Sequence, residues 1–108
     1  MAAGPRMTIP AQLVLQVLLE DPQRELYGRE LGEAAGLPSG TIHPILARFE
    51  ATGWLESRWE DIDASAEGRP ARRYYRLTPD GAVRARDALA RAYRNRSPGI
   101  VRPASGEA

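Results

Sequence analysis

Two short helical segments joined by a tight turn restrict the fold of this chain more than any other feature of its sequence. The first segment covers residues 27–35, and Gly36 has the character of a C-terminal stop. After a short turn, Ser39 is the expected N-cap of a second helix over residues 40–52, which Gly53 ends. Two short helices around a glycine-containing turn are typical of a helix-turn-helix unit.

After the second helix, the apolar pattern changes from a helical to an alternating period. Residues 54–60 and 71–77 are predicted strands, and the polar segment 61–70 between them is too long for a tight hairpin turn. Predicted helices flank this region, one over residues 8–20 and one that begins at 79 and frays near 95. The sequence therefore predicts a mainly α fold with a small β-hairpin, namely a winged helix-turn-helix with flanking N- and C-terminal helices.

The length of 108 residues predicts a single domain over residues 8–96 that includes the C-terminal helix. Residues 1–7 are an expected flexible arm, and residues 97–108 an expected disordered tail. The chain has no cysteine, so disulfides and thiolate metal sites are excluded, and its one histidine cannot form a metal site alone. We expect no metal and no cofactor. With neither an apolar run of bilayer length nor a signal-peptide pattern, we expect a cytoplasmic protein without membrane contact.

Positive charge is concentrated in one part of the chain, although the net charge is only +1. Residues 1–63 carry a net charge of −5, whereas residues 64–96 carry +6. Such clustering is the pattern expected where a surface meets phosphate groups.

The predicted helix over residues 40–52 has an apolar arc and an opposite face of different character. The arc, which must face the core, contains Ile42, Ile45, Leu46 and Phe49. The opposite face contains Thr41, Pro44, Ala47, Arg48 and Ala51, with His43 at its flank. Small residues allow close approach to base edges, and Thr41 and Arg48 can donate hydrogen bonds to them. The alternative is a short surface helix with a featureless outer face.

The predicted returning strand, residues 71–77, places its side chains alternately on two faces. If Leu77 points into the core, then Tyr75 and Arg73 share its side, and Tyr74, Arg76 and Arg72 point outward. Arginines crowd the turn end of this hairpin, at positions 69, 72 and 73. Such a ribbon is suited to a minor groove or to flanking phosphates. The alternative is a solvated edge hairpin whose arginines prevent aggregation.

Four sequence blocks resemble the PadR-type transcriptional regulators, which are named for the control of phenolic acid decarboxylase. They are LYGREL at 26–31, SGTIHPIL with RFE at 39–50, GWLES at 53–57, and GRP with RRYYRLTPDG at 68–81. The blocks keep the order and spacing of the family, and the chain resembles its small members.

The resemblance implies a winged-helix homodimer that binds double-stranded DNA at an inverted-repeat operator, usually as a repressor released by a small-molecule effector. The positions it implies for the recognition helix are Ser39, Gly40, Thr41, His43, Pro44 and Arg48. It also implies a phosphate contact by Tyr27 and wing contacts by Arg69, Arg72 and Arg73. The family most often has tyrosine where this chain has His43.

The first predicted helix is apolar almost all round, which indicates burial on several sides, and a second protomer is one way to achieve it. The resemblance adds dimerisation through the C-terminal helix. The expected interface residues are Leu13, Val14, Val17, Ala85, Leu89, Ala92 and Tyr93.

Two other functions compete with DNA binding. The first is a winged-helix module that binds protein, which is favoured if the wing arginines pair with Glu67 or with the acids of residues 56–63. The second is a small-molecule sensor with an effector pocket between Trp54, Trp59 and the dimer helices. An enzyme is not expected, because the sequence has no nucleophile–base pair, metal cluster or phosphate-binding loop.

Overall fold

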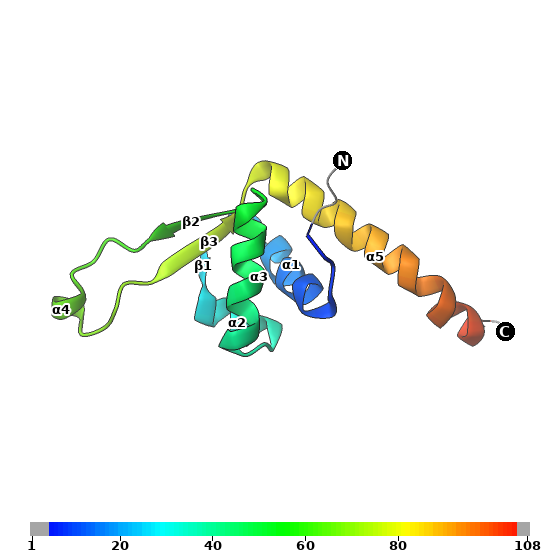
Figure 1. Ribbon diagram of the computed structural model, residues 1–108, viewed down its shortest axis with the longest axis horizontal. Coiled ribbons are helices and arrows are strands. Elements are labelled where there is room, and N and C mark those ends of the chain that lie inside the picture. The colour runs from blue at the N-terminus through cyan, green and yellow to red at the C-terminus, as the bar shows by residue number, and fades with distance from the viewer. Residues whose placement is uncertain (1–4, 106–108) are drawn as a thin grey trace.

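The computed structural model describes the backbone of residues 5–105 and the side chains as far as residue 95. Five helices and three strands follow one another along this part of the chain (Figure 1). Their order is α1 (Ile9–Glu20), β1 (Leu26–Tyr27), α2 (Gly28–Ala35), α3 (Ser39–Ala51), β2 (Leu55–Trp59), α4 (Ala64–Glu67), β3 (Arg73–Leu77) and α5 (Pro79–Ser105). The predicted mainly α fold with a small hairpin is confirmed. No helix in the described residues has the length and apolar character needed to cross a bilayer.

The helix ends follow from local capping. Thr8 is the N-cap of α1, as its side chain predicts, and its Oγ1 accepts the N–H of Ala11 at 3.2 Å. Gly36 ends α2 with a φ of 72°, a left-handed conformation that glycine adopts without steric cost. The prediction that Ser39 caps α3 is wrong, since Ser39 is the first helical residue and Pro38 is the N-cap. The Pro38 carbonyl accepts the N–H groups of residues 41 and 42 at 2.9 and 3.0 Å, so no side-chain cap is used.

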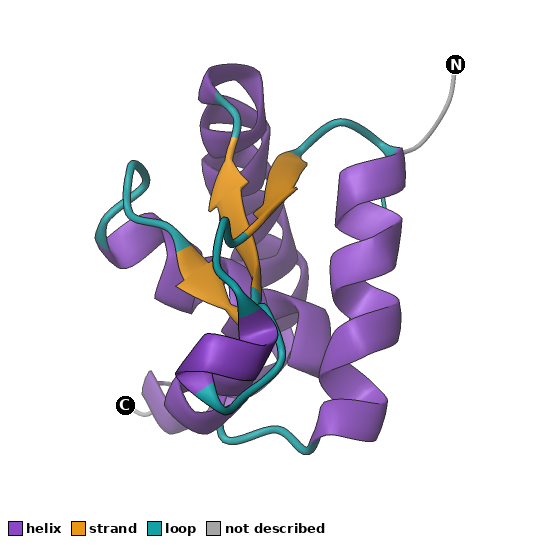
Figure 2. Cartoon of the chain, turned by 90° about the vertical axis from the view of Figure 1, so that its left-hand side faces the viewer, coloured by secondary structure: helices purple, strands orange, loops and turns teal. Residues whose placement is uncertain are grey.

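The three strands form an antiparallel sheet in the order β1-β3-β2, and helices lie around it (Figure 2). In the hairpin, Leu55 pairs with Leu77 and Trp59 with Arg73, which confirms the predicted strand pair with slightly shorter ends. β1 was not predicted, because a two-residue strand has no periodicity to detect. The short helix α4 lies in the predicted loop, where the side chain of Asp63 accepts the N–H groups of residues 65 and 66. β2, β3 and the segment between them form the wing, which projects from the domain on the side away from α5 (Figure 1).

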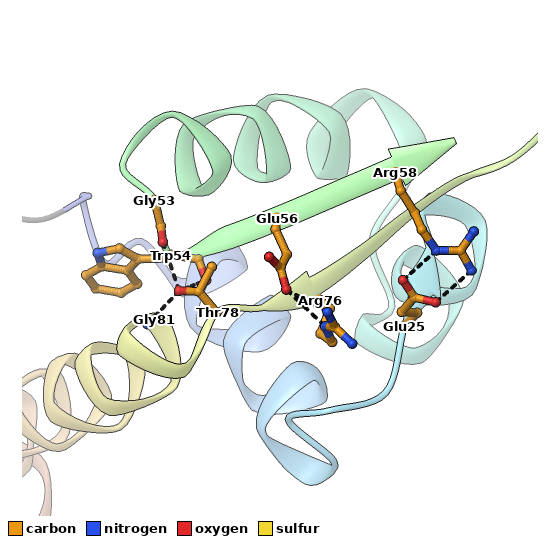
Figure 3. Close-up of polar contacts among 8 residues, drawn as sticks. All are labelled: Glu25, Gly53, Trp54, Glu56, Arg58, Arg76, Thr78 and Gly81. Atoms are coloured by element: carbon orange, nitrogen blue, oxygen red, sulfur yellow. Dashed lines mark hydrogen bonds and ion pairs between the residues drawn. The ribbon is translucent and has the colours of Figure 1, made fainter. Parts of the chain in front are cut away.

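The hydrophobic core lies between α1, α2, α3, the base of the sheet and the start of α5. Phe49 of α3 is its largest fully buried side chain, and its ring stacks on Trp54 with 5.5 Å between the ring centroids. A close backbone contact joins the sheet to α5: a Cβ atom on Gly81 would overlap the backbone of Trp54. The hydroxyl of Thr78 donates to the Gly53 carbonyl at 2.9 Å and accepts the Gly81 N–H at 2.8 Å (Figure 3). The Thr-Pro-Asp-Gly sequence thus fixes where α5 leaves the sheet.

Both predicted ends of the domain differ from the structure. Met7, expected in a flexible arm, packs against the core, and its carbonyl accepts a hydrogen bond from the Gln12 side chain at 2.9 Å. α5, expected to fray near Asn95, continues to Ser105, so the expected disorder from residue 97 is not observed as far as 105. Adding a residue to an existing helix requires less free energy than nucleating a new helix, so α5 continues beyond the residues at which it was expected to end. Residues 1–4 and 106–108 of the predicted arm and tail lie outside the described residues.

Candidate nucleic-acid interface

Helix α3 divides into the two faces that its sequence predicts. Its inner face is in the core, with Ile42, Ile45, Leu46 and Phe49 all at most 4% exposed. Its outer face presents Ser39, Gly40, His43, Pro44, Ala47, Arg48 and Ala51 to solvent, and Thr41 is half-buried. Within residues 5–95, Arg48 makes no ion pair. The outer face of α3 therefore offers an unengaged guanidinium group among small side chains.

His43 lies across the start of α2 rather than standing free on α3. A Cβ atom on Gly28, the first residue of α2, would come 3.0 Å from Cε1 of the His43 ring. The ring thus occupies the space that any larger residue at position 28 would need. The two residues border a groove of about 570 Å³ between α2 and α3. The absence of a side chain at Gly28 therefore leaves the space in which the His43 ring lies.

The side of β3 that faces α3 carries the side chains predicted for it. Leu77 is buried, Tyr75 packs against the core, and burial raises the pKa of the Tyr75 phenol. Arg73 donates from Nε to the Ser57 hydroxyl at 3.0 Å, and its Nη2 lies 3.4 Å from a carboxylate oxygen of Glu50 on α3. Arg73 therefore joins the wing to α3, and its expected contact with DNA stays a prediction.

Two ion pairs cover the other side of the sheet (Figure 3). Arg58 donates to both carboxylate oxygens of Glu25 at 2.7 Å, and these bonds lower the pKa of Glu25. Arg76 donates to Glu56 at 3.1 and 2.8 Å. The first pair joins β2 to the segment before β1, and the second pairs β3 with β2.

Arg69, expected to contact DNA, is engaged within the wing. Its Nη1 and Nη2 donate to the two carboxylate oxygens of Glu60 at 2.8 and 3.0 Å. These bonds raise the pKa of Arg69 and lower that of Glu60 to about 2. Residues 55–77 contain five arginines and five acids, so the wing has no net charge. The expectation of a basic wing is therefore wrong. The charge count for residues 1–63 and 64–96 divides the wing, so it separates the arginines that follow α4 from acids such as Glu60 and Glu56, with which they pair in the fold.

Arg72 is the wing arginine that remains without an ion pair within residues 5–95. Its guanidinium lies over the ring of Tyr27, 4.3 Å from the centroid, and Tyr27 is the N-cap of α2. Both residues border a notch of about 310 Å³ between the start of α2 and the wing. Arg29, which the sequence did not single out, lines the same notch and makes an exposed pair with Glu33 at 3.2 Å. Its position two residues after Tyr27 was the available signal.

The residues expected at a dimer interface divide into two groups. Val14 and Ala85 have no exposed surface, because α1 and α5 pack on each other within one chain, so their assignment to an interface is wrong. Leu13, Val17, Leu89 and Ala92 are half-buried, and Tyr93 is 60% exposed.

Within one chain Trp54 and Trp59 lie in different surroundings, and the effector pocket expected between them and the dimer helices stays a prediction. Trp54 is buried against Phe49, whereas Trp59 is 61% exposed with Arg73 over its ring at 5.2 Å. Trp54 directly precedes β2, whereas Trp59 is the last residue of that strand. Among the described residues no cluster of three His, Asp or Glu side chains that could hold a metal ion occurs.

Comparisons with known proteins place this geometry among transcriptional regulators. The family model described as "Transcriptional regulator PadR-like family" matches residues 14–87. The PcaV transcriptional regulator of Streptomyces coelicolor, solved with its natural ligand, is 26% identical with a TM-score of 0.68, over 90% of this chain and 62% of PcaV. The chain thus spans less than two thirds of the length of PcaV.

Two further solved structures share the fold. A PadR-like transcriptional regulator of Bacillus cereus is 20% identical with a TM-score of 0.66, over 92% of this chain and 94% of that protein. Overoxidized AbfR bound to DNA is 23% identical with a TM-score of 0.62, over 88% of this chain and 65% of AbfR. No curated protein was found to match the chain.

Proposed function

We propose that this chain, which belongs to the PadR-like family of transcriptional regulators, represses transcription by binding an inverted-repeat operator as a homodimer. The members of this family and the similar solved structures named above are regulators and not enzymes. In the proposed complex, two α3 helices enter successive major grooves, about 34 Å apart along the duplex.

The observation that supports this proposal most is that two arginines expected to contact DNA make no ion pair within residues 5–95. Arg48 on the outer face of α3 has no acidic partner among residues 5–95, and neither has Arg72 beside Tyr27. An arginine on a recognition helix can donate two hydrogen bonds to a guanine edge, whereas an arginine beside a helix start suits a phosphate. We assign base reading to Thr41, His43 and Arg48, and phosphate contact to Tyr27 and Arg72. Ser39, Gly40 and Pro44 border the reading surface.

The homodimer is supported by an apolar stripe on α5 that continues beyond the domain. The first part of the stripe, Ala82, Ala85 and Ala88, is buried in the core of its own chain. The stripe continues at helical spacing through Leu89 and Ala92 to Tyr93, while α5 extends away from the other helices (Figure 1). A second α5 would cover this part. We therefore assign the interface to Leu89, Ala92 and Tyr93, with Leu13 and Val17 of α1 at its edge.

Release by a small molecule is the remaining part of the proposal. PcaV was solved with its natural ligand and AbfR was solved bound to DNA, and both share this fold. A regulator of this kind can couple the two events if a ligand favours a dimer whose α3 helices no longer match the operator spacing. The effector would then weaken operator binding without touching α3.

A gel-shift series with duplexes from the region upstream of the protein's own coding sequence tests DNA binding. We expect a specific complex whose affinity falls steeply with salt, because arginine–phosphate contacts release counterions. Arg48→Ala should lower the preference for operator over scrambled DNA, whereas Arg72→Ala should weaken binding to both duplexes alike. If no duplex is bound at low salt, DNA binding is wrong, and the neutral wing then favours a protein partner.

A further inference from the structure

The carboxylate of Glu60 is the most heavily engaged polar group of the wing. Besides the two bonds from Arg69, it accepts the backbone N–H of Arg72 at 3.1 Å. Its own N–H donates to the Arg72 carbonyl at 2.7 Å. The pair of residues 60 and 72 thus adds one further step to the strand ladder beyond Trp59 and Arg73. One side chain therefore closes the base of the loop that carries the wing tip.

The ion pair of this closure is partly exposed to solvent. The Glu60 side chain is 17% exposed and that of Arg69 is 32% exposed. Arg69 also donates to the carbonyl of Pro70 at 3.2 Å, so its guanidinium is held on both sides. An arginine held in this way is less available to a phosphate than one that faces solvent, because binding the phosphate would leave the Glu60 carboxylate without its partner.

The closure fixes the position of Arg72. Its backbone is fixed by Glu60 on one side of the strand, and its guanidinium lies over Tyr27. Arg72 therefore borders the notch in a defined position, together with Arg29 and residues 69–71. A charged group that is already held in place loses less conformational entropy when it binds a phosphate.

We propose that Glu60, an acidic residue in a DNA-binding wing, is a positioning residue that strengthens DNA binding by holding Arg69 and fixing Arg72 at the phosphate notch. The inference rests on the proposed function and assigns Arg69 an indirect role. The proposal predicts a change in DNA affinity opposite to the change that charge alone predicts. Removal of a negative charge near DNA should tighten binding by charge alone, whereas loss of the positioning contact should weaken it.

The test compares Glu60→Gln with Glu56→Gln, measured by fluorescence anisotropy with an operator duplex and with a scrambled duplex. Glu56 is the matched control, because its carboxylate is also paired with an arginine, but it lies near the start of β2, whereas Glu60 directly follows the end of that strand. We expect Glu60→Gln to weaken binding to both duplexes about fivefold and Glu56→Gln not to weaken it. A cooperative thermal unfolding transition in each variant would establish that both are folded.

A double-mutant cycle with Arg69→Gln separates the two roles of Arg69. If Arg69 acts through Glu60, each single variant should lose a similar affinity and the double variant should lose no more. If Arg69 contacts phosphate directly, Glu60→Gln releases it and tightens binding, and the proposal is overturned. Backbone hydrogen exchange at Arg72 should become faster in Glu60→Ala, which removes the acceptor of its N–H, and unchanged exchange would also overturn the proposal. A wild-type protein that binds no duplex would contradict the proposed function itself, a result distinct from tight binding by the variant.

Discussion

Substitution of Gly28 by alanine tests whether the position of His43 matters for reading DNA. The added Cβ would stand 3.0 Å from Cε1 of the His43 ring, whereas ordinary contacts begin at 3.4 Å. The ring must therefore move by at least about 0.4 Å, and an exposed side chain can do so at little cost to the fold. Alanine also lowers the entropy of the unfolded chain, so the free energy of unfolding should stay the same or rise by up to about 1 kcal/mol.

The expected loss is in DNA affinity. A displaced ring should weaken operator binding by about three- to tenfold, or roughly 0.7–1.4 kcal/mol, and leave binding to scrambled DNA unchanged. Anisotropy titrations give both affinities, and denaturant unfolding gives the stability. Gly40→Ala is the control for stability, because a Cβ atom there meets nothing within 4 Å.

A double-mutant cycle decides whether the effect passes through the ring. With His43→Ala as the background, Gly28→Ala should cause no further loss, since the colliding ring is absent. If Gly28→Ala weakens binding equally in both backgrounds, the backbone of α2 has shifted instead. In that case the inference that Gly28 places His43 is refuted.

Three further expectations concern the wing, the core and the dimer. The pKa of Glu60 is lowered to about 2 from an ordinary 4.5, so its ion pair contributes full stability above pH 4.5 and loses it as the pH falls toward 2. The emission of the exposed Trp59 should therefore stay constant between pH 5 and 8, and a transition near neutral pH would contradict this assignment. Gly81→Ala should destabilise the fold by about 3 kcal/mol in thermal unfolding, because its Cβ overlaps the Trp54 backbone, and a loss below about 1 kcal/mol would show that α5 can shift. Tyr93→Glu should convert the dimer to a monomer in analytical ultracentrifugation with the fold retained, and a persisting dimer would place the interface elsewhere.

The features that repeat along the chain could be predicted from the sequence. The helical spacing of Ile42, Ile45 and Phe49 predicts the buried face of α3, and the alternation around Leu77 predicts the two sides of β3. Capping by Thr8 could also be predicted, because the cap and its partner are only three residues apart in the sequence.

The features that depend on distant pairs could not be predicted. Arg58 pairs with Glu25 and Arg73 with Glu50, and no local pattern links such partners. The burial of Val14 and Ala85 has the same origin, because an apolar helix face predicts a contact and does not identify the partner.

The neutral wing changes how this regulator would achieve specificity. Non-specific affinity comes almost entirely from phosphate neutralisation, and each phosphate contact adds about 0.9 to the salt dependence of binding. Arginines that pair with acids inside the fold hold the wing in shape but do not add to this non-specific affinity for phosphate. Fewer free cations weaken binding to every sequence, whereas base contacts from α3 are lost only at wrong sequences. Under the proposed function, the ratio between binding to the operator and binding to other DNA would then depend mainly on Arg48, Thr41 and the placed ring of His43. If the proposed function holds, a chain with a net charge of only +1 discriminates between sequences because it does not bind all of them strongly.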